Sequence, residues 1–134
     1  MGQSIRVLHV DDQPAVATMT ADLLERAHDR IEVVVEHSGR SGMARLSGET
    51  PAIDCVVSDY DMPDMDGLAF LDEVRAHHPN LPFILYTGMG SDRLERVALD
   101  RGATAYFEKG TDPRKFERMA DRIGCAVESY RAEH

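Results

Sequence analysis

Carboxylate side chains stand at the ends of two short apolar runs in this 134-residue chain. Asp11 and Asp12 follow the run 5–10, and Asp59 follows the run 53–58 and opens a loop that contains proline and glycine. Such a run followed by such a loop is typical of a buried strand that ends there. Ligands of open α/β sheets bind outside the carboxyl ends of the strands. Asp59 is therefore the first candidate for chemistry, the alternative being that its side chain only initiates a turn.

Three carboxylates at one sheet edge also predict a metal ion. Asp11, Asp12 and Asp59 would repel one another if they converged, unless a cation lay among them. A carboxylate-rich ligand set with little histidine or cysteine favours Mg²⁺, with Mn²⁺ as the second choice. Mg²⁺ usually keeps several waters and completes its shell with a substrate phosphate. The acidic cluster therefore predicts a divalent ion and a partner that carries phosphate.

Two further polar residues follow apolar runs, and both suit a phosphoryl group. Thr87 follows the run 83–86 and could donate a hydroxyl hydrogen bond, while Lys109 follows the run 104–108 and offers a compact positive charge. Lysine is scarce among the 15 basic residues of this chain, which favours a specific role for Lys109. Asp59 is then placed to act as a nucleophile and to form an aspartyl phosphate.

The elements that must position these residues alternate between strand and helix. Apolar and β-branched runs predict five strands, at Ile5–Val10, Ile31–Val35, Ile53–Ser58, Phe83–Tyr86 and Thr104–Glu108. Helical spacing after each strand predicts five helices, at Pro14–Ala27, at Ser38–Leu46, from Leu68 to before Pro79, at Ser91–Arg101 and from Phe116 to Tyr130. This alternation implies parallel strands, right-handed crossovers and helices on both faces of the sheet. We therefore predict one doubly wound α/β domain over residues 1–134, with its core at about 5–130.

Composition narrows the class of partner. The net charge of −9 argues against direct binding to nucleic acid, because phosphate backbones are held mainly by lysine and arginine. No apolar run is long enough to span a bilayer, and the first residues lack the features of a signal peptide. We therefore expect a cytoplasmic protein without a membrane partner. Cys55 and Cys125 lie among apolar residues, which predicts reduced, buried thiols.

The acidic, lysine-poor composition also suits a salt-rich cytoplasm. The chain has 24 acidic residues against 15 basic ones, and concentrated salt would screen their mutual repulsion. A preference for arginine codons in GC-rich DNA is the alternative explanation for the scarcity of lysine. If salt adaptation is correct, the thermal midpoint rises between low and multimolar salt. A midpoint that stayed constant over that range would contradict it.

Four motifs together make the chain similar to the receiver domain of two-component response regulators. They are the acidic pair at 11–12, the run D-x-D-M-P-x-M-D-G at 59–67, Thr87 with the following glycine, and Lys109. They occur in the order and spacing of that family, and the match covers about Ile5 to Tyr130. The resemblance implies a flavodoxin-like sheet of strand order 2-1-3-4-5. One departure concerns Gly110, because the family usually has proline after the lysine, and this leaves Lys109 less rigidly placed.

The resemblance also implies a mechanism. A histidine kinase or phosphotransfer protein would donate a phosphoryl group from its phosphohistidine to Asp59. Mg²⁺ would be held by Asp12, Asp59 and the backbone carbonyl of Asp61, with Asp11 acting through water. The domain would catalyse its own phosphorylation and slow dephosphorylation without turning over a separate substrate.

A conformational switch follows from the same resemblance. Thr87 would move toward the phosphoryl group, and Tyr106 would fill the vacated space; the alternative is that Tyr106 only covers the sheet edge. The surface formed by the fourth helix, fifth strand and fifth helix would then change and contact an output partner of unknown identity. The apolar face of the fourth helix is thin, at Leu94, Val97 and Ala98, which is consistent with movement.

Other functions remain open at the level of sequence. A haloacid-dehalogenase-like phosphohydrolase also uses a nucleophilic aspartate with a second aspartate two residues later, as Asp59 and Asp61 would provide. That family places this motif after its first strand, whereas Asp59 follows the third. A degenerate receiver that only docks partners is a further alternative. The chain is either a free-standing regulator of the chemotaxis or phosphorelay type or a receiver from a longer protein.

Overall fold

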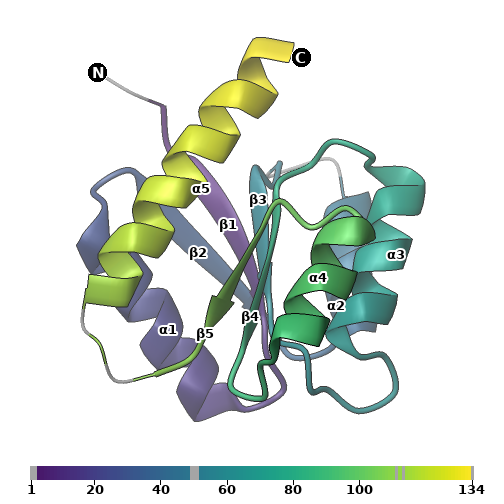
Figure 1. The fold of residues 1–134 in the computed structure, drawn as a ribbon. Helices are drawn as coiled ribbons and strands as arrows, with labels where there is room; N and C mark the ends of the chain where they lie inside the picture. The colour runs from purple at the N-terminus through teal and green to yellow at the C-terminus, as the bar shows by residue number, and fades with distance from the viewer. Residues whose placement is uncertain (1–2, 49–51, 111, 113, 134) are drawn as a thin grey trace.

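The computed structural model describes residues 3–48, 52–110, 112 and 114–133. Five parallel strands form one sheet in the order β2-β1-β3-β4-β5 (Figure 1). The strands are β1 (Ile5–Val10), β2 (Ile31–Glu36), β3 (Cys55–Ser58), β4 (Phe83–Thr87) and β5 (Ala105–Glu108). The helices are α1 (Pro14–Ala27), α2 (Gly39–Ser47), α3 (Gly67–His77), α4 (Asp92–Asp100) and α5 (Arg114–Glu133). The predicted doubly wound fold and strand order are confirmed.

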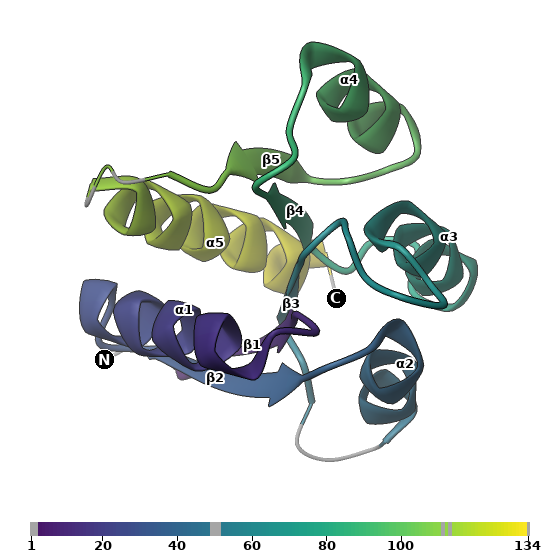
Figure 2. The same cartoon turned by 90° about the horizontal axis from the view of Figure 1, so that it is seen from below.

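Helices cover both faces of the sheet. Helices α1 and α5 lie on one face, and α2, α3 and α4 lie on the other (Figure 2). Each face has its own buried apolar cluster, one built around Phe70 and Phe83 and the other around Ile84 and Met119. All four residues of β3 are buried, as expected for a central strand of a parallel sheet. The strands that carry the site residues at their ends are therefore held by packed apolar side chains on both faces.

Side-chain caps fix where the helices begin. Ser38, Asp66 and Ser91 each accept a hydrogen bond from a backbone N–H in the first turn of α2, α3 and α4, respectively. Asp66 ends the long acidic loop after β3, and Gly67 follows it. A Cβ atom at Gly67 would lie 2.4 Å from the carbonyl oxygen of Asp59, so only glycine lets α3 start so close to that residue. The glycine of the D-x-D-M-P-x-M-D-G run thus allows the start of α3 to pack against the backbone of Asp59.

Strand register brings the carboxyl ends of the strands together. Val10 pairs with Ser58, so the residues that follow them, Asp11 and Asp59, lie side by side. The backbone N–H of Asp59 donates a 2.9 Å hydrogen bond to the carbonyl of Val10. At the carboxyl ends of β4 and β5, the N–H of Lys109 likewise donates to the carbonyl of Thr87 at 2.8 Å. The register alone therefore places the predicted site residues along one edge of the sheet.

Several local expectations need adjustment. The third strand begins at Cys55 rather than at Ile53, and Cys125 is exposed because it lies on the outer side of α5 rather than in the core. The apolar face of α4 is thin as predicted, since Ala98 is the only residue of that helix that is buried.

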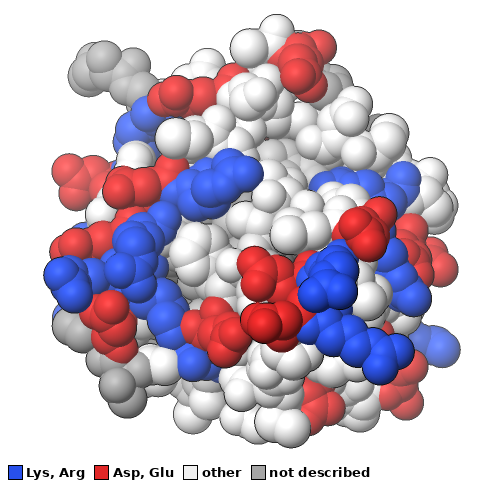
Figure 3. Space-filling view, in the orientation of Figure 1, with Lys and Arg blue, Asp and Glu red and all other residues white. Residues whose placement is uncertain are grey.

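The surface carries charges of both signs. On the face shown in Figure 3, acidic and basic side chains are interspersed. No helix in the described part of the chain combines the length and the apolar character needed to cross a membrane.

Candidate functional site

Three carboxylates converge at the ends of β1 and β3. Asp11, Asp12 and Asp59 each offer an oxygen atom, and these atoms all lie within 4.8 Å of one another. Asp11 and Asp59 are buried, at 0% and 6% exposure, and Asp12 is partly buried. Like charges this close and this far from water are costly unless cations balance them. The three carboxylates of the predicted acidic cluster therefore lie close together in the folded chain.

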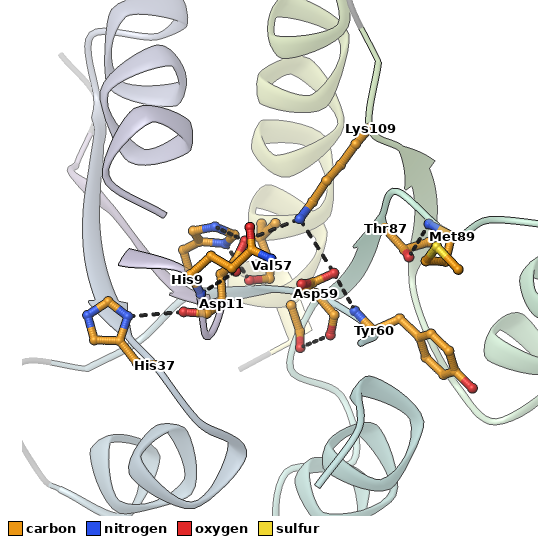
Figure 4. Close-up of polar contacts among 11 residues, drawn as sticks. His9, Asp11, His37, Val57, Asp59, Tyr60, Thr87, Met89 and Lys109 are labelled. Carbon is orange, nitrogen blue, oxygen red and sulfur yellow. Dashed lines mark hydrogen bonds and ion pairs between the residues drawn. The ribbon is translucent and has the colours of Figure 1, made fainter. Parts of the chain in front are cut away.

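Lys109 reaches this cluster from the end of β5. Its Nζ atom lies 3.2 Å from Oδ2 of Asp11 and 3.5 Å from Oδ1 of Asp59 (Figure 4). The ammonium thus bridges the two buried carboxylates and offsets part of their charge. From this position the Lys109 ammonium could also neutralise negative charge on a group attached to Asp59.

The carboxylate of Asp59 is held by local contacts. Its Oδ1 atom accepts a 2.8 Å hydrogen bond from the backbone N–H of Tyr60. Burial raises the pKa of Asp59, and the charge of Asp11 raises it further, whereas Lys109 lowers it. A second cation beside Asp59 would favour the ionised form, which is the nucleophilic one.

The residues present fit a divalent metal ion. Oδ1 of Asp12 is buried and has no hydrogen-bond partner among the described residues. An unsatisfied carboxylate oxygen is costly in a buried position, and a bound cation would remove that cost. Oxygen donors of this kind suit Mg²⁺ or Mn²⁺. The exposed side chain of Asp61 lies outside this cluster, so any role of that residue would fall to its backbone carbonyl.

His9 was not predicted as a site residue, yet it lies directly beneath the cluster. It is completely buried, and its Nδ1 atom lies 2.9 Å from the carbonyl of Val57, so Nδ1 carries the proton. Its Nε2 atom, unpartnered among the described residues, lies 3.9 Å from Oδ2 of Asp11. Burial lowers the pKa of His9, so the ring is neutral near pH 7. Its place in an apolar strand gave no signal of this proximity.

Thr87 and Tyr106 lie at the same edge but do not contact the carboxylates. The buried hydroxyl of Thr87 accepts a 3.0 Å hydrogen bond from the backbone N–H of Met89 (Figure 4). The hydroxyl of Tyr106 accepts a 3.1 Å hydrogen bond from the N–H of Ser91, and the ring is partly exposed. The structure therefore brings Asp11, Asp12, Asp59 and Lys109 together, with Thr87 at the end of the adjacent strand.

Metal binding should be visible as a gain in stability. At a Mg²⁺ concentration ten times the dissociation constant, we expect the free energy of unfolding to rise by about 1.4 kcal/mol, because the ion binds the folded chain alone. Chemical denaturation with and without Mg²⁺ measures this gain. Asp12→Ala should lose it, whereas Asp61→Ala should keep most of it because only the backbone carbonyl of Asp61 is expected to contact the ion. Equal gains in Asp12→Ala and the unaltered protein would contradict the metal site.

Comparison with known proteins adds an independent line of evidence. The family model described as the response regulator receiver domain matches residues 7–121. The chain is 30% identical over 121 residues to the chemotaxis protein CheY of Treponema pallidum, covering 89% of this chain and 83% of that one. It is 32% identical over 108 residues to the probable transcriptional regulatory protein TcrX of Mycobacterium tuberculosis, covering 81% of this chain but only 44% of that longer one.

Solved structures agree with the sequence relatives. A CheY-like response regulator receiver domain protein from Methanospirillum hungatei superposes with a TM-score of 0.82 at 26% identity, covering 98% of this chain and all of that one. A response regulator receiver domain protein from Clostridium thermocellum superposes with a TM-score of 0.84 at 24% identity, covering 97% of this chain and 99% of that one. The second likeness supports the fold alone.

Proposed function

Because the chain belongs to the family of response regulator receiver domains, we propose that Asp59 accepts a phosphoryl group from the phosphohistidine of a histidine kinase or phosphotransfer protein. The observation that carries this proposal is the buried carboxylate of Asp59, which lies 3.5 Å from the Lys109 ammonium beside Asp11 and Asp12. A nucleophile, a fixed cation and a set of metal-ligating oxygens are the parts that phosphoryl transfer to an aspartate requires.

The transfer would proceed by in-line displacement. An oxygen of Asp59 forms a bond to phosphorus while the bond from phosphorus to the donor imidazole nitrogen breaks, and that nitrogen keeps the electron pair. Lys109 stays beside the carboxylate and offsets charge on a phosphoryl oxygen. A divalent ion held by Asp12, Asp59 and the carbonyl of Asp61, with Asp11 acting through water, would supply the remaining positive charge. Catalysis by this chain is then mainly positioning and electrostatics.

Phosphorylation would change the edge of the sheet near β4. The Thr87 hydroxyl, which now accepts from Met89, would turn to donate to a phosphoryl oxygen. Tyr106 would leave its contact with Ser91 and move into the space that Thr87 vacates. The face formed by α4, β5 and α5 would shift and engage an output partner, with α4 free to move because only Ala98 of that helix is buried.

We propose further that residues 1–134 form one receiver domain, which would act in the cytoplasm. The aspartyl phosphate would hydrolyse slowly, returning the domain to its starting state. The chain would contact neither nucleic acid nor a membrane itself.

Phosphoryl stoichiometry tests the proposal. Incubation with phosphoramidate and Mg²⁺, a small-molecule source of the same phosphorus–nitrogen bond, should give up to one acid-labile phosphoryl group per chain, and removal of the divalent ion with EDTA should abolish it. A haloacid-dehalogenase-like phosphohydrolase would instead release many equivalents of phosphate from phosphomonoesters. A degenerate docking module would take up none. Either of these results would contradict the proposed function.

A further inference from the structure

The aromatic ring of Tyr86 lies against both lysine side chains of this protein. Lys109 and Lys115 are the only lysines in the sequence, and their Nζ atoms lie 5.5 and 5.9 Å from the centroid of this ring. An ammonium within about 6 Å of an aromatic centroid is attracted by the negative face of the ring. Tyr86 belongs to β4 and is only 3% exposed, so water competes little for this contact.

We propose that Tyr86 is a positioning residue for phosphoryl transfer, with its ring holding the Lys109 ammonium beside the carboxylate of Asp59. This inference rests on the proposed function of Asp59. A lysine side chain is a flexible stem with a mobile charge, so its position must come from its contacts. The residue after it, Gly110, has no side chain to restrain the turn. The ring of Tyr86 supplies a contact in addition to those with the two carboxylates.

The ring differs from the other partners of Lys109 in what happens to it during the reaction. Asp59 loses its free charge when it is phosphorylated, and Asp11 shares its charge with any bound metal ion. The ring stays neutral throughout, because burial, together with the charges of Asp11 and Asp59, raises the pKa of the Tyr86 hydroxyl to about 12. Its attraction for Lys109 is therefore the same before and after transfer.

The apolar cluster to which Tyr86 belongs is mostly aliphatic. Ile84, for example, lies two residues earlier on the same face of β4 and belongs to the same cluster. At Tyr86 the ring is instead held by Phe116, whose centroid lies 6.2 Å away at an interplanar angle of 72°. This edge-on contact fixes the ring orientation in which its face meets the ammonium groups.

Lys115 supports the same interpretation from α5. The residue is only 8% exposed, and within the described part of the chain no carboxylate lies within 4.0 Å of its ammonium, so the ring is its principal partner. A Cβ atom at Gly110 would lie 2.9 Å from its Nζ atom, so glycine there leaves room for the lysine. Tyr86 thus joins the first turn of α5 to the turn that carries Lys109.

Lysine NMR signals test the ring contact without reference to activity. A chain labelled with ¹³C at the lysine ε position gives two signals, and the ring current of Tyr86 should shift both upfield. Tyr86→Phe, which retains a ring, should keep these shifts, and Tyr86→Leu should return both signals to the position of free lysine. Lys115→Arg removes one signal and so assigns the other to Lys109. A Lys109 signal that did not move in Tyr86→Leu would overturn the proposal.

The rate of phosphoryl uptake then tests the positioning role. With phosphoramidate and Mg²⁺, Tyr86→Leu should slow uptake about fivefold, in line with a partly buried cation–π contact, and Tyr86→Phe should restore it. Phe116→Leu retains the Tyr86 ring but removes the contact that orients it, and so should slow uptake less than Tyr86→Leu does. If Tyr86→Leu reacts at the wild-type rate, the positioning role is wrong while the phosphoacceptor role stands. If the unaltered protein takes up no phosphoryl group, the proposed function itself fails, and the NMR signals still decide the ring contact.

Discussion

Replacing Asp59 by asparagine should reduce phosphoryl uptake to the background level. The amide nitrogen and oxygen of asparagine fill nearly the same volume but lack the negative charge that makes a carboxylate oxygen nucleophilic. We expect the neighbouring buried carboxylate of Asp11 not to substitute, because it is bound by Lys109 at 3.2 Å and accepts a hydrogen bond from the backbone N–H of Gln13. Uptake is measured as acid-labile phosphate per chain after incubation with phosphoramidate and Mg²⁺.

Two controls separate lost chemistry from lost structure. Asp66→Asn removes the same charge from the same loop but retains an oxygen that can cap α3, so its uptake should remain close to that of the unaltered protein. Asp59→Asn itself should be more stable than the unaltered protein at neutral pH. Because burial raises the pKa of Asp59 in the folded state, the ionised carboxylate costs stability at any pH above that pKa. This cost falls as the pH drops below the folded-state pKa and is gone below the ordinary pKa of an aspartate. Full uptake by a folded Asp59→Asn variant would overturn the nucleophile assignment.

Removal of the Lys109 charge should have the second-largest effect. Lys109→Gln is expected to slow phosphoryl uptake by about 10²- to 10³-fold, the usual cost of losing one preorganised electrostatic contact at a reacting group. The ammonium lies within 3.5 Å of both Asp11 and Asp59, so its loss also leaves two buried carboxylates without their shared counter-charge. Initial rates at several phosphoramidate concentrations would separate slower chemistry from weaker binding of the donor.

The matched control for this variant is an exposed arginine of α5. Arg118→Gln removes one positive charge that pairs with Asp112 at 3.4 Å, away from the carboxylate cluster. Its uptake rate should stay within about twofold of the unaltered protein, because an exposed charge is screened by solvent. If Arg118→Gln and Lys109→Gln slowed uptake equally, the effect would reflect overall charge rather than a contact at the site.

The sequence contained most of the information about the fold because its patterns were strong. Alternating apolar runs and helical stripes predicted all ten elements, and the polar residues after the strands predicted the edge at which Asp11, Asp59 and Lys109 meet. The error at the start of the third strand arose because Ile53 is apolar like the strand itself, although pairing with β1 begins only at Cys55. Patterns of apolar residues indicate burial, whereas strand ends depend on hydrogen bonding.

Contacts made by polar or aromatic residues within apolar strands were harder to predict. His9 and Tyr86 each occupy an apolar strand, where the simplest expectation is core packing. Periodicity assigns each of them to a face of the sheet but does not identify the neighbours that the adjacent strand and helix bring to that face. The same holds for the hydroxyl of Thr87, whose hydrogen bond with Met89 depends on a side-chain rotation. Cys125 shows the opposite case, since apolar neighbours in sequence did not make it buried.

The most direct test of the account is to identify the phosphorylated residue. Sodium borohydride reduces the acyl phosphate of an aspartate to homoserine, which remains attached to the chain as a stable mark. After phosphorylation with phosphoramidate and Mg²⁺, reduction and proteolysis, peptide mass spectrometry should find homoserine at position 59 and aspartate at positions 11, 12 and 61. A phosphoryl group on a histidine, or homoserine at another aspartate with position 59 unchanged, would contradict the central claim that Asp59 is the phosphoacceptor.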